Sequence, residues 1–188
     1  MIRYSFILFI LTHCLQISQA QGWGGGLSMG INLSQVDGDL QGGYNQVGLH
    51  FGGFASWAFN EKWSMKPEII FNQKGARSIA VNLFSRFNCI DVPVTANYLA
   101  FSWGDLRVGL QGGLMIGGLL SQRNGWTKDD STSAWSKFDC GMIFGADIQF
   151  NSFLGLLIRH NYSMFFKKST GSAFFHRFIT VAVRVYLR

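Results

Sequence analysis

Residues 23–34 read WGGGLSMGINLS, and their side chains alternate in character. The odd positions carry apolar groups such as Leu27, Met29 and Ile31, whereas the even positions carry glycine, serine or asparagine. A period of two is the periodicity of a β-strand, in which successive side chains point to opposite faces. The stretch therefore predicts a strand with one apolar face and one small or polar face.

The same alternation returns along the whole chain, between stretches of turn residues. It predicts strands over 23–34, 45–59, 63–76, 86–99, 106–120, 137–150, 153–163 and 175–188. The connections after the second, fourth and sixth strands are short, and the others are longer and more polar. Short turns at one end and long loops at the other are typical of an up-and-down transmembrane β-barrel. After residue 20 no uninterrupted apolar run is long enough for a membrane-spanning helix.

The polar faces of these strands carry charged residues of both signs. They are Lys66, Glu68, Lys74, Asp91, Arg107, Asp139, Asp147, Arg159 and Arg184. Side chains just fill the interior of a barrel of about eight strands. We therefore predict an all-β fold, an eight-stranded antiparallel up-and-down transmembrane β-barrel, with these charges in the lumen and the apolar faces in lipid. The alternative is a soluble β-domain with the two faces exchanged. The charges could line a polar conduit, but a mutually paired network that makes the barrel rigid is the favoured interpretation.

The composition supports a membrane environment. Only 14% of the 188 residues are charged, 15% are aromatic and the formal net charge is +6. Residues 1–20 combine Arg3, an apolar core and a small Ala20, which predicts a cleaved signal peptide and a mature barrel domain over 21–188. Export excludes nucleic acid as the partner of the basic charge. Outer-membrane lipid and lipopolysaccharide are the expected counterparts.

The sequence gives little indication of chemistry. It has no CxxC or HExxH spacing, so we expect no cofactor, no metal site and no catalytic residue. Cys89 and Cys140 fall on opposite faces and are expected to be free thiols. In RHNYS (159–163), His160 and Ser163 also fall on opposite faces, which makes a lipid-modifying membrane enzyme the least favoured function. The close carboxylates of DGDLQGG (37–43) lack the full ligand pattern of a calcium loop.

Several stretches resemble the PorT-like outer-membrane β-barrel proteins of the Bacteroidota. They are GINLSQVDGD (30–39), FNEKWSMKPEIIFNQKGA (59–76), IDVPVTANY (90–98), VGLQGGLMIGGLL (108–120), FDCGMIFGADIQF (138–150) and LIRHNYSMFF (157–166). Both prolines, Pro67 and Pro93, lie in these stretches, where we expect β-bulges because proline cannot donate to a strand ladder. The chain ends in RVYLR, so Tyr186 would have to serve as the C-terminal aromatic residue of such barrels.

The resemblance implies a location in the bacterial outer membrane and an accessory role in a secretion or envelope system. We therefore expect a monomeric, non-enzymatic protein with a structural or partner-binding role at the cell envelope, in contact with an envelope or secretion protein. A narrow pore or small-ligand transporter is the alternative.

Overall fold

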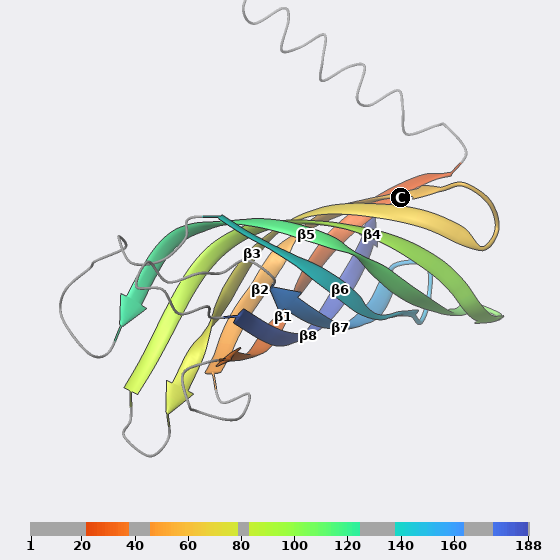
Figure 1. The fold of residues 1–188 in the computed structure, drawn as a ribbon. Helices are drawn as coiled ribbons and strands as arrows, with labels where there is room; N and C mark the ends of the chain where they lie inside the picture. Colours follow the sequence, from red (N-terminus) through yellow and green to blue (C-terminus); the bar gives the residue numbers. More distant parts are fainter. Residues whose placement is uncertain (1–21, 38–45, 79–82, 125–137, 164–174, 188) are drawn as a thin grey trace, which may run out of the picture.

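The computed structural model describes residues 22–37, 46–78, 83–124, 138–163 and 175–187. Its strands are β1 (Trp23–Asp37), β2 (Gln46–Ala58), β3 (Trp63–Ser78), β4 (Leu83–Trp103), β5 (Leu106–Asn124), β6 (Phe138–Gln149), β7 (Leu154–Ser163) and β8 (Phe175–Leu187). Each strand pairs antiparallel with the next, and β1 also pairs with β8, so the sheet closes into one barrel (Figure 1). The eight-stranded fold expected from the alternation is confirmed. Within these ranges, no helix has the length and apolarity needed to cross a membrane.

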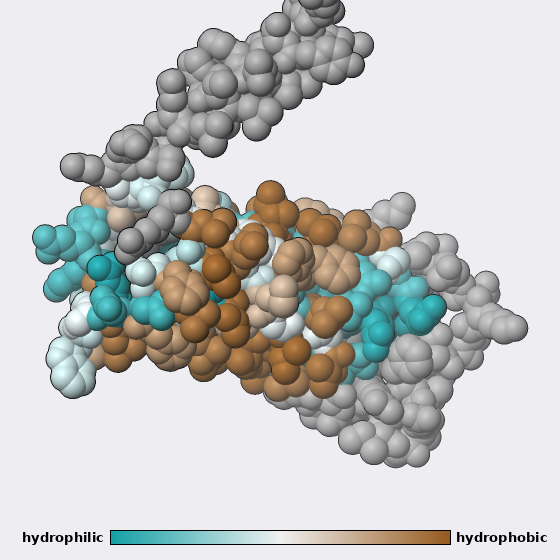
Figure 2. Space-filling model, turned by 180° about the vertical axis from the view of Figure 1, so that it is seen from behind, coloured by the Kyte–Doolittle hydropathy of each residue, from teal (hydrophilic) through white to brown (hydrophobic). Residues whose placement is uncertain are grey.

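The exposure of the side chains is opposite to that of a soluble protein. The outward positions are apolar: Met29, Ile69 and Leu114 are 64%, 65% and 65% exposed. Charged groups such as Asp91 and Arg184 are completely buried in the interior. Figure 2 shows the result as an apolar band across the middle of the barrel, with hydrophilic groups at both ends. Such a band is what a bilayer requires of a barrel's outer face.

Aromatic side chains collect beside the short turns. Trp23 stacks on Trp57, with ring centroids 5.7 Å apart, and Trp63 lies 5.0 Å from Tyr98. Trp103, beside the turn between β4 and β5, is 79% exposed. Amphipathic rings prefer the membrane–water interface, so this end of the band has an aromatic girdle.

Strand β4 differs most from its predicted range of 86–99. It continues through Phe101 and Trp103 to a turn in which Gly104 has a φ of 58°. The pairing of β4 with β5 shifts register between Leu99 and Phe101. This bulge breaks the period of two, which is why the sequence pattern predicts the end of the strand too early, at residue 99.

The expectation of bulges at the two prolines is wrong. Between β2 and β3 the pairing runs from Phe54–Glu68 to Trp57–Met65 without a register shift, although Pro67 lies in the gap. The pairing of β3 with β4 is likewise interrupted beside Pro93 and resumes in the same register. A proline removes a donor from the ladder but does not add a residue to it. The second bulge lies instead between Asn88 and Cys89.

The outward position of the apolar face predicts how stability depends on membrane depth. Leu114 lies in the middle of β5 and is 65% exposed, so Leu114→Arg places a charge near the bilayer centre. We expect this change to cost about 2–4 kcal/mol of folding free energy, while Phe153→Arg at the short-turn end costs about 1 kcal/mol or less. Urea titrations of barrels folded into lipid vesicles measure both values. Equal costs would contradict the assignment of the apolar band to lipid.

Candidate functional site in the barrel interior

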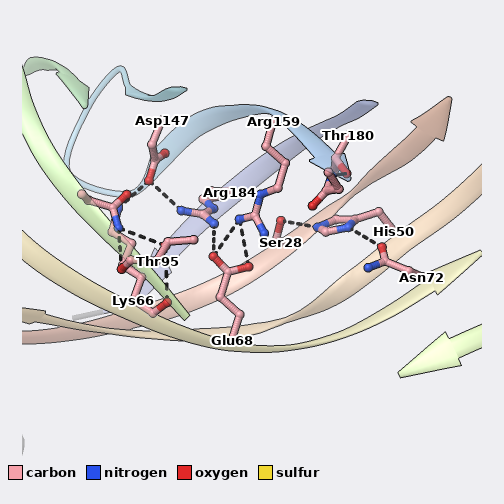
Figure 3. Close-up of polar contacts among 12 residues, drawn as sticks. Ser28, His50, Lys66, Glu68, Asn72, Thr95, Asp147, Arg159, Thr180 and Arg184 are labelled. Carbon is pink, nitrogen blue, oxygen red and sulfur yellow. Dashed lines mark hydrogen bonds and ion pairs between the residues drawn. The ribbon is translucent and has the colours of Figure 1, made fainter. Parts of the chain in front are cut away.

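The largest cluster in the lumen is built around Glu68 of β3. Arg159 of β7 donates from Nη2 to both carboxylate oxygens, at 2.7 and 3.0 Å. Arg184 of β8 donates from Nη2 to Oε1 of Glu68 at 2.5 Å and from Nη1 to Oδ2 of Asp147 at 2.6 Å. Figure 3 shows both guanidinium groups directed at the one carboxylate. Arg184 thus bridges the carboxylates of β3 and β6.

Asp147 of β6 is held by three donors. Besides Arg184, Lys66 of β3 forms an ion pair with Oδ2. The hydroxyl of Tyr186 donates to Oδ1 at 2.9 Å. The phenol of Tyr186, expected to serve as the C-terminal aromatic residue of the barrel, is therefore part of the interior network.

A second ionic cluster lies nearer the long-loop end. Lys74 of β3 pairs with Asp91 of β4 at 2.8 Å and with Asp139 of β6 at 3.5 Å. The hydroxyl of Ser163 on β7 donates to Asp139. These contacts again join strands from different parts of the wall.

Uncharged polar side chains extend this cluster across the lumen. Asn72 donates to Asp91 at 2.6 Å and accepts from Asn32 at 2.9 Å. His50 lies between Asn72 and Ser28, with distances of 2.8 and 3.1 Å (Figure 3). Thr180 of β8 donates to Asn32 at 2.8 Å, so these contacts join β8, β1, β2 and β3. All of these residues lie on the polar faces of their strands, but the alternation does not reveal partners, so the sequence predicts none of these contacts.

The buried charges balance. Of the nine residues predicted to form the lumen network, the structure buries eight: Lys66, Lys74, Arg159 and Arg184, with Glu68, Asp91, Asp139 and Asp147. Four cations thus face four carboxylates among the described side chains. Burying an ion costs several kcal/mol unless it is paired, so equal numbers of cations and carboxylates, each in contact with an opposite charge, are what a low-dielectric barrel can hold.

Arg107 is the exception, and its assignment to the lumen network is wrong. The alternation along β5 places Arg107 on the inward face of the strand. It lies only one residue from the start of that strand, however, and its side chain is exposed there. The odd or even position of a residue in a strand predicts which side of the barrel wall its side chain faces, but not how far along the barrel axis it lies. Arg107 lines an open cavity at the short-turn end instead.

This cavity has a volume of about 510 Å³. Its rim includes Trp23, Trp63 and Arg107, and its lining includes Lys66 and Asp147 of the ionic cluster. Water can therefore enter the barrel from the short-turn end as far as the Lys66–Asp147 pair. The sequence pattern gave no signal for this vestibule, because its residues come from several turns and strand ends.

The described residues do not bring reactive groups together. Ser163 lies in the lumen with Asp139, whereas His160 is half-buried on the other face of β7 and stacks on Phe144 with centroids 5.0 Å apart. Cys89 is buried and Cys140 half-buried, and neither forms a disulfide. In the part of the chain that the structure describes, no group of three or more histidine, cysteine or acidic side chains could hold a metal. Residues 1–21, the DGDLQGG stretch beyond Asp37 and most of the other long connections lie outside the described residues.

The pairing of Glu68 predicts a specific stability pattern. Glu68→Gln leaves Arg159 and Arg184 buried with one carboxylate fewer, and we expect it to cost about 3–5 kcal/mol. Adding Arg159→Met restores the balance of charge and should recover part of this loss. Urea titrations in lipid vesicles test both variants. A single variant as stable as the parent, or a double variant less stable than the single one, would contradict a network held by charge pairing.

Comparisons with known proteins agree with this geometry. The model of the outer membrane protein beta-barrel domain family matches residues 16–166. No curated protein matches the sequence.

Two solved structures show the same fold. Ail, the attachment invasion locus protein of Yersinia pestis, has a TM-score of 0.54 at 12% identity over 89% of this chain and 100% of its own. Neisserial surface protein A has a TM-score of 0.53 at 12% identity, over 88% of this chain and 97% of its own. At these identities the likeness concerns the fold alone. The family match covers most of the sequence, and the chain therefore belongs to the outer membrane protein β-barrel family, whose place is the bacterial outer membrane.

Proposed function

We propose that this protein is a closed, non-enzymatic barrel with a structural or partner-binding role at the cell envelope. The observation that carries the proposal is the contact between Glu68 and Arg159. These residues come from β3 and β7, which lie opposite each other in the closed order of strands. Their pairing spans the lumen from wall to wall, which supports a closed barrel.

The electrostatics of the lumen support a plug more than a conduit. A conducting pore needs water and mobile ions along its axis, but the described lumen charges neutralise one another in pairs and bridges. Side chains can fill a barrel of this size without leaving a channel. Opening such a path requires the simultaneous loss of several charge-assisted hydrogen bonds, which are stronger than neutral ones.

Function is then expected on the outside of the barrel. Loops on a rigid scaffold commonly carry recognition, and the long connections all leave one end of this barrel. We include in the proposal an envelope or secretion protein partner, contact with outer-membrane lipid and lipopolysaccharide, and a monomeric state. The resemblance to PorT-like barrels supports an accessory role in secretion.

A narrow pore remains the second candidate because of the vestibule. The cavity of about 510 Å³ reaches Lys66 and Asp147. Among the described residues, the ionic clusters and buried apolar side chains such as Met115 and Phe178 then separate it from the other end. A pore would have to open by rearrangement of these clusters.

Planar-bilayer recordings of residues 21–188 distinguish the two functions. We expect no current steps above the lipid background, with the parent protein or with Arg107→Ala at the vestibule rim. Asp147→Ala removes an acceptor shared by Lys66, Arg184 and Tyr186, and it provides a variant with a loosened plug. Current steps from the parent protein that change in size with Asp147→Ala would overturn the closed barrel in favour of the pore.

A further inference from the structure

The outer face of the β4–β5 pair becomes polar toward the long loops. On β4 the outward positions Val92 and Ile90 are followed by Asn88 and then Arg86. Asn88 donates from its side chain to the hydroxyl of Ser121 at 2.8 Å, across to β5. One pair farther on, Arg86 lies directly opposite Arg123. The two arginines therefore form a cross-strand pair on the outside of the barrel.

The height of this pair matches the head-group layer. A strand rises about 3.3 Å per residue, which is about 2.5 Å along the membrane normal at a tilt near 40°. Arg86 then lies about 10 Å beyond Ile90, the outward apolar side chain of β4 nearest to the pair among those the structure describes. The bulge in the β4–β5 pairing, between Asn88 and Cys89, lies where the outward side chains of β4 change from apolar to polar. Because the aromatic girdle lies at the short-turn end, the pair belongs to the opposite leaflet.

The positive charge of the pair is not compensated within the described chain. Like charges directly opposite each other on a sheet are destabilising. On its other side Arg86 is paired with Gly75, which has no side chain. The acidic strand residues whose side chains the structure describes all face the lumen, and none forms an ion pair with Arg86 or Arg123. In addition, Nε of Arg86 is buried without a hydrogen-bond partner in the structure.

We propose that Arg86 and Arg123 together bind a phosphate group of lipid A in the outer leaflet. A guanidinium group donates two parallel hydrogen bonds to phosphate, and two such groups side by side match one dianion. The amide of Asn88 and the hydroxyl of Ser121 lie toward the membrane from the pair, where the sugar carrying the phosphate would sit. The site deepens the lipopolysaccharide contact proposed above and does not depend on whether the lumen conducts.

The test uses the folded barrel in detergent micelles with purified lipids as probes. Bisphosphorylated lipid A should raise the midpoint of thermal unfolding, read as the loss of the fast-migrating band on a gel. Lipid A without phosphates should leave the midpoint unchanged, as should millimolar inorganic phosphate, which lacks the acyl chains.

Substitutions of the two arginines test whether the stabilisation by lipid A depends on this pair. Arg86→Gln with Arg123→Gln should abolish the rise and weaken lipid A binding at least tenfold. Arg107→Gln, which neutralises an exposed arginine at the other end, should bind as the parent does. Arg123→Gln alone provides a milder variant and should already weaken binding severalfold. Arg86→Lys with Arg123→Lys keeps the charge but not the paired donors, and it should bind more weakly than the parent.

Three results would overturn the site. They are an unchanged response in the double glutamine variant, an equal response to lipid A without phosphates, and an equal loss with Arg107→Gln. Stabilisation of the parent by inorganic phosphate alone to the same extent would also overturn it, in favour of a free anion site. Current steps in planar bilayers would contradict the closed barrel but leave this site intact, so the two proposals fail separately.

Discussion

The closure of β1 onto β8 is the constraint on which the rest of this structure depends. Hydrocarbon offers no hydrogen-bond partner to an unpaired strand edge, so a sheet can cross it only as a closed barrel. Here β1 pairs with β8 from Gly25–Leu187 to Asp37–Phe175, which leaves no free edge between the first and last strands. Closure at eight strands also fixes the bore, and the bore is so narrow that side chains from opposite walls touch. The ionic contacts of the lumen follow from this width.

Those contacts explain how so much charge can be buried at the level of the membrane. Glu68 receives two guanidinium groups, and Asp147 receives a lysine, an arginine and a phenol. Each carboxylate is thus shared between strands, and the four buried cations match four buried anions. The other charged strand residues that the structure describes lie toward the ends of the barrel. There Arg86 and Arg123 meet the head-group layer and Arg107 meets the vestibule.

Much of the fold could be predicted from the sequence, because lipid imposes a simple alternation. The spacing of Leu27, Met29 and Ile31 is enough to predict the apolar face of the first strand. The same alternation predicts eight strands and eight of the nine lumen charges. The rule failed where geometry departs from it. The bulge near Leu99 breaks the alternation, so the sequence pattern ends β4 too early. Pro67 and Pro93 interrupt the strand pairing but do not form bulges. The odd or even position of a residue also says nothing about its depth along the barrel axis. For this reason the sequence wrongly predicts Arg107 as part of the lumen network. The partners of Asn72 and His50 depend on three-dimensional distances across the bore, for which the sequence contains no signal.

Electrophoretic migration is the most direct test of whether the apolar face of the barrel lies in lipid while the charged side chains pair with one another inside it. Residues 21–188 are refolded with and without detergent or lipid vesicles, and unboiled samples are compared with boiled ones on a gel. We expect a faster-migrating unboiled band that forms only in detergent or lipid. A chain that folds as a soluble, monodisperse monomer without any amphiphile would contradict it, because the exposed apolar band would then have to be a core.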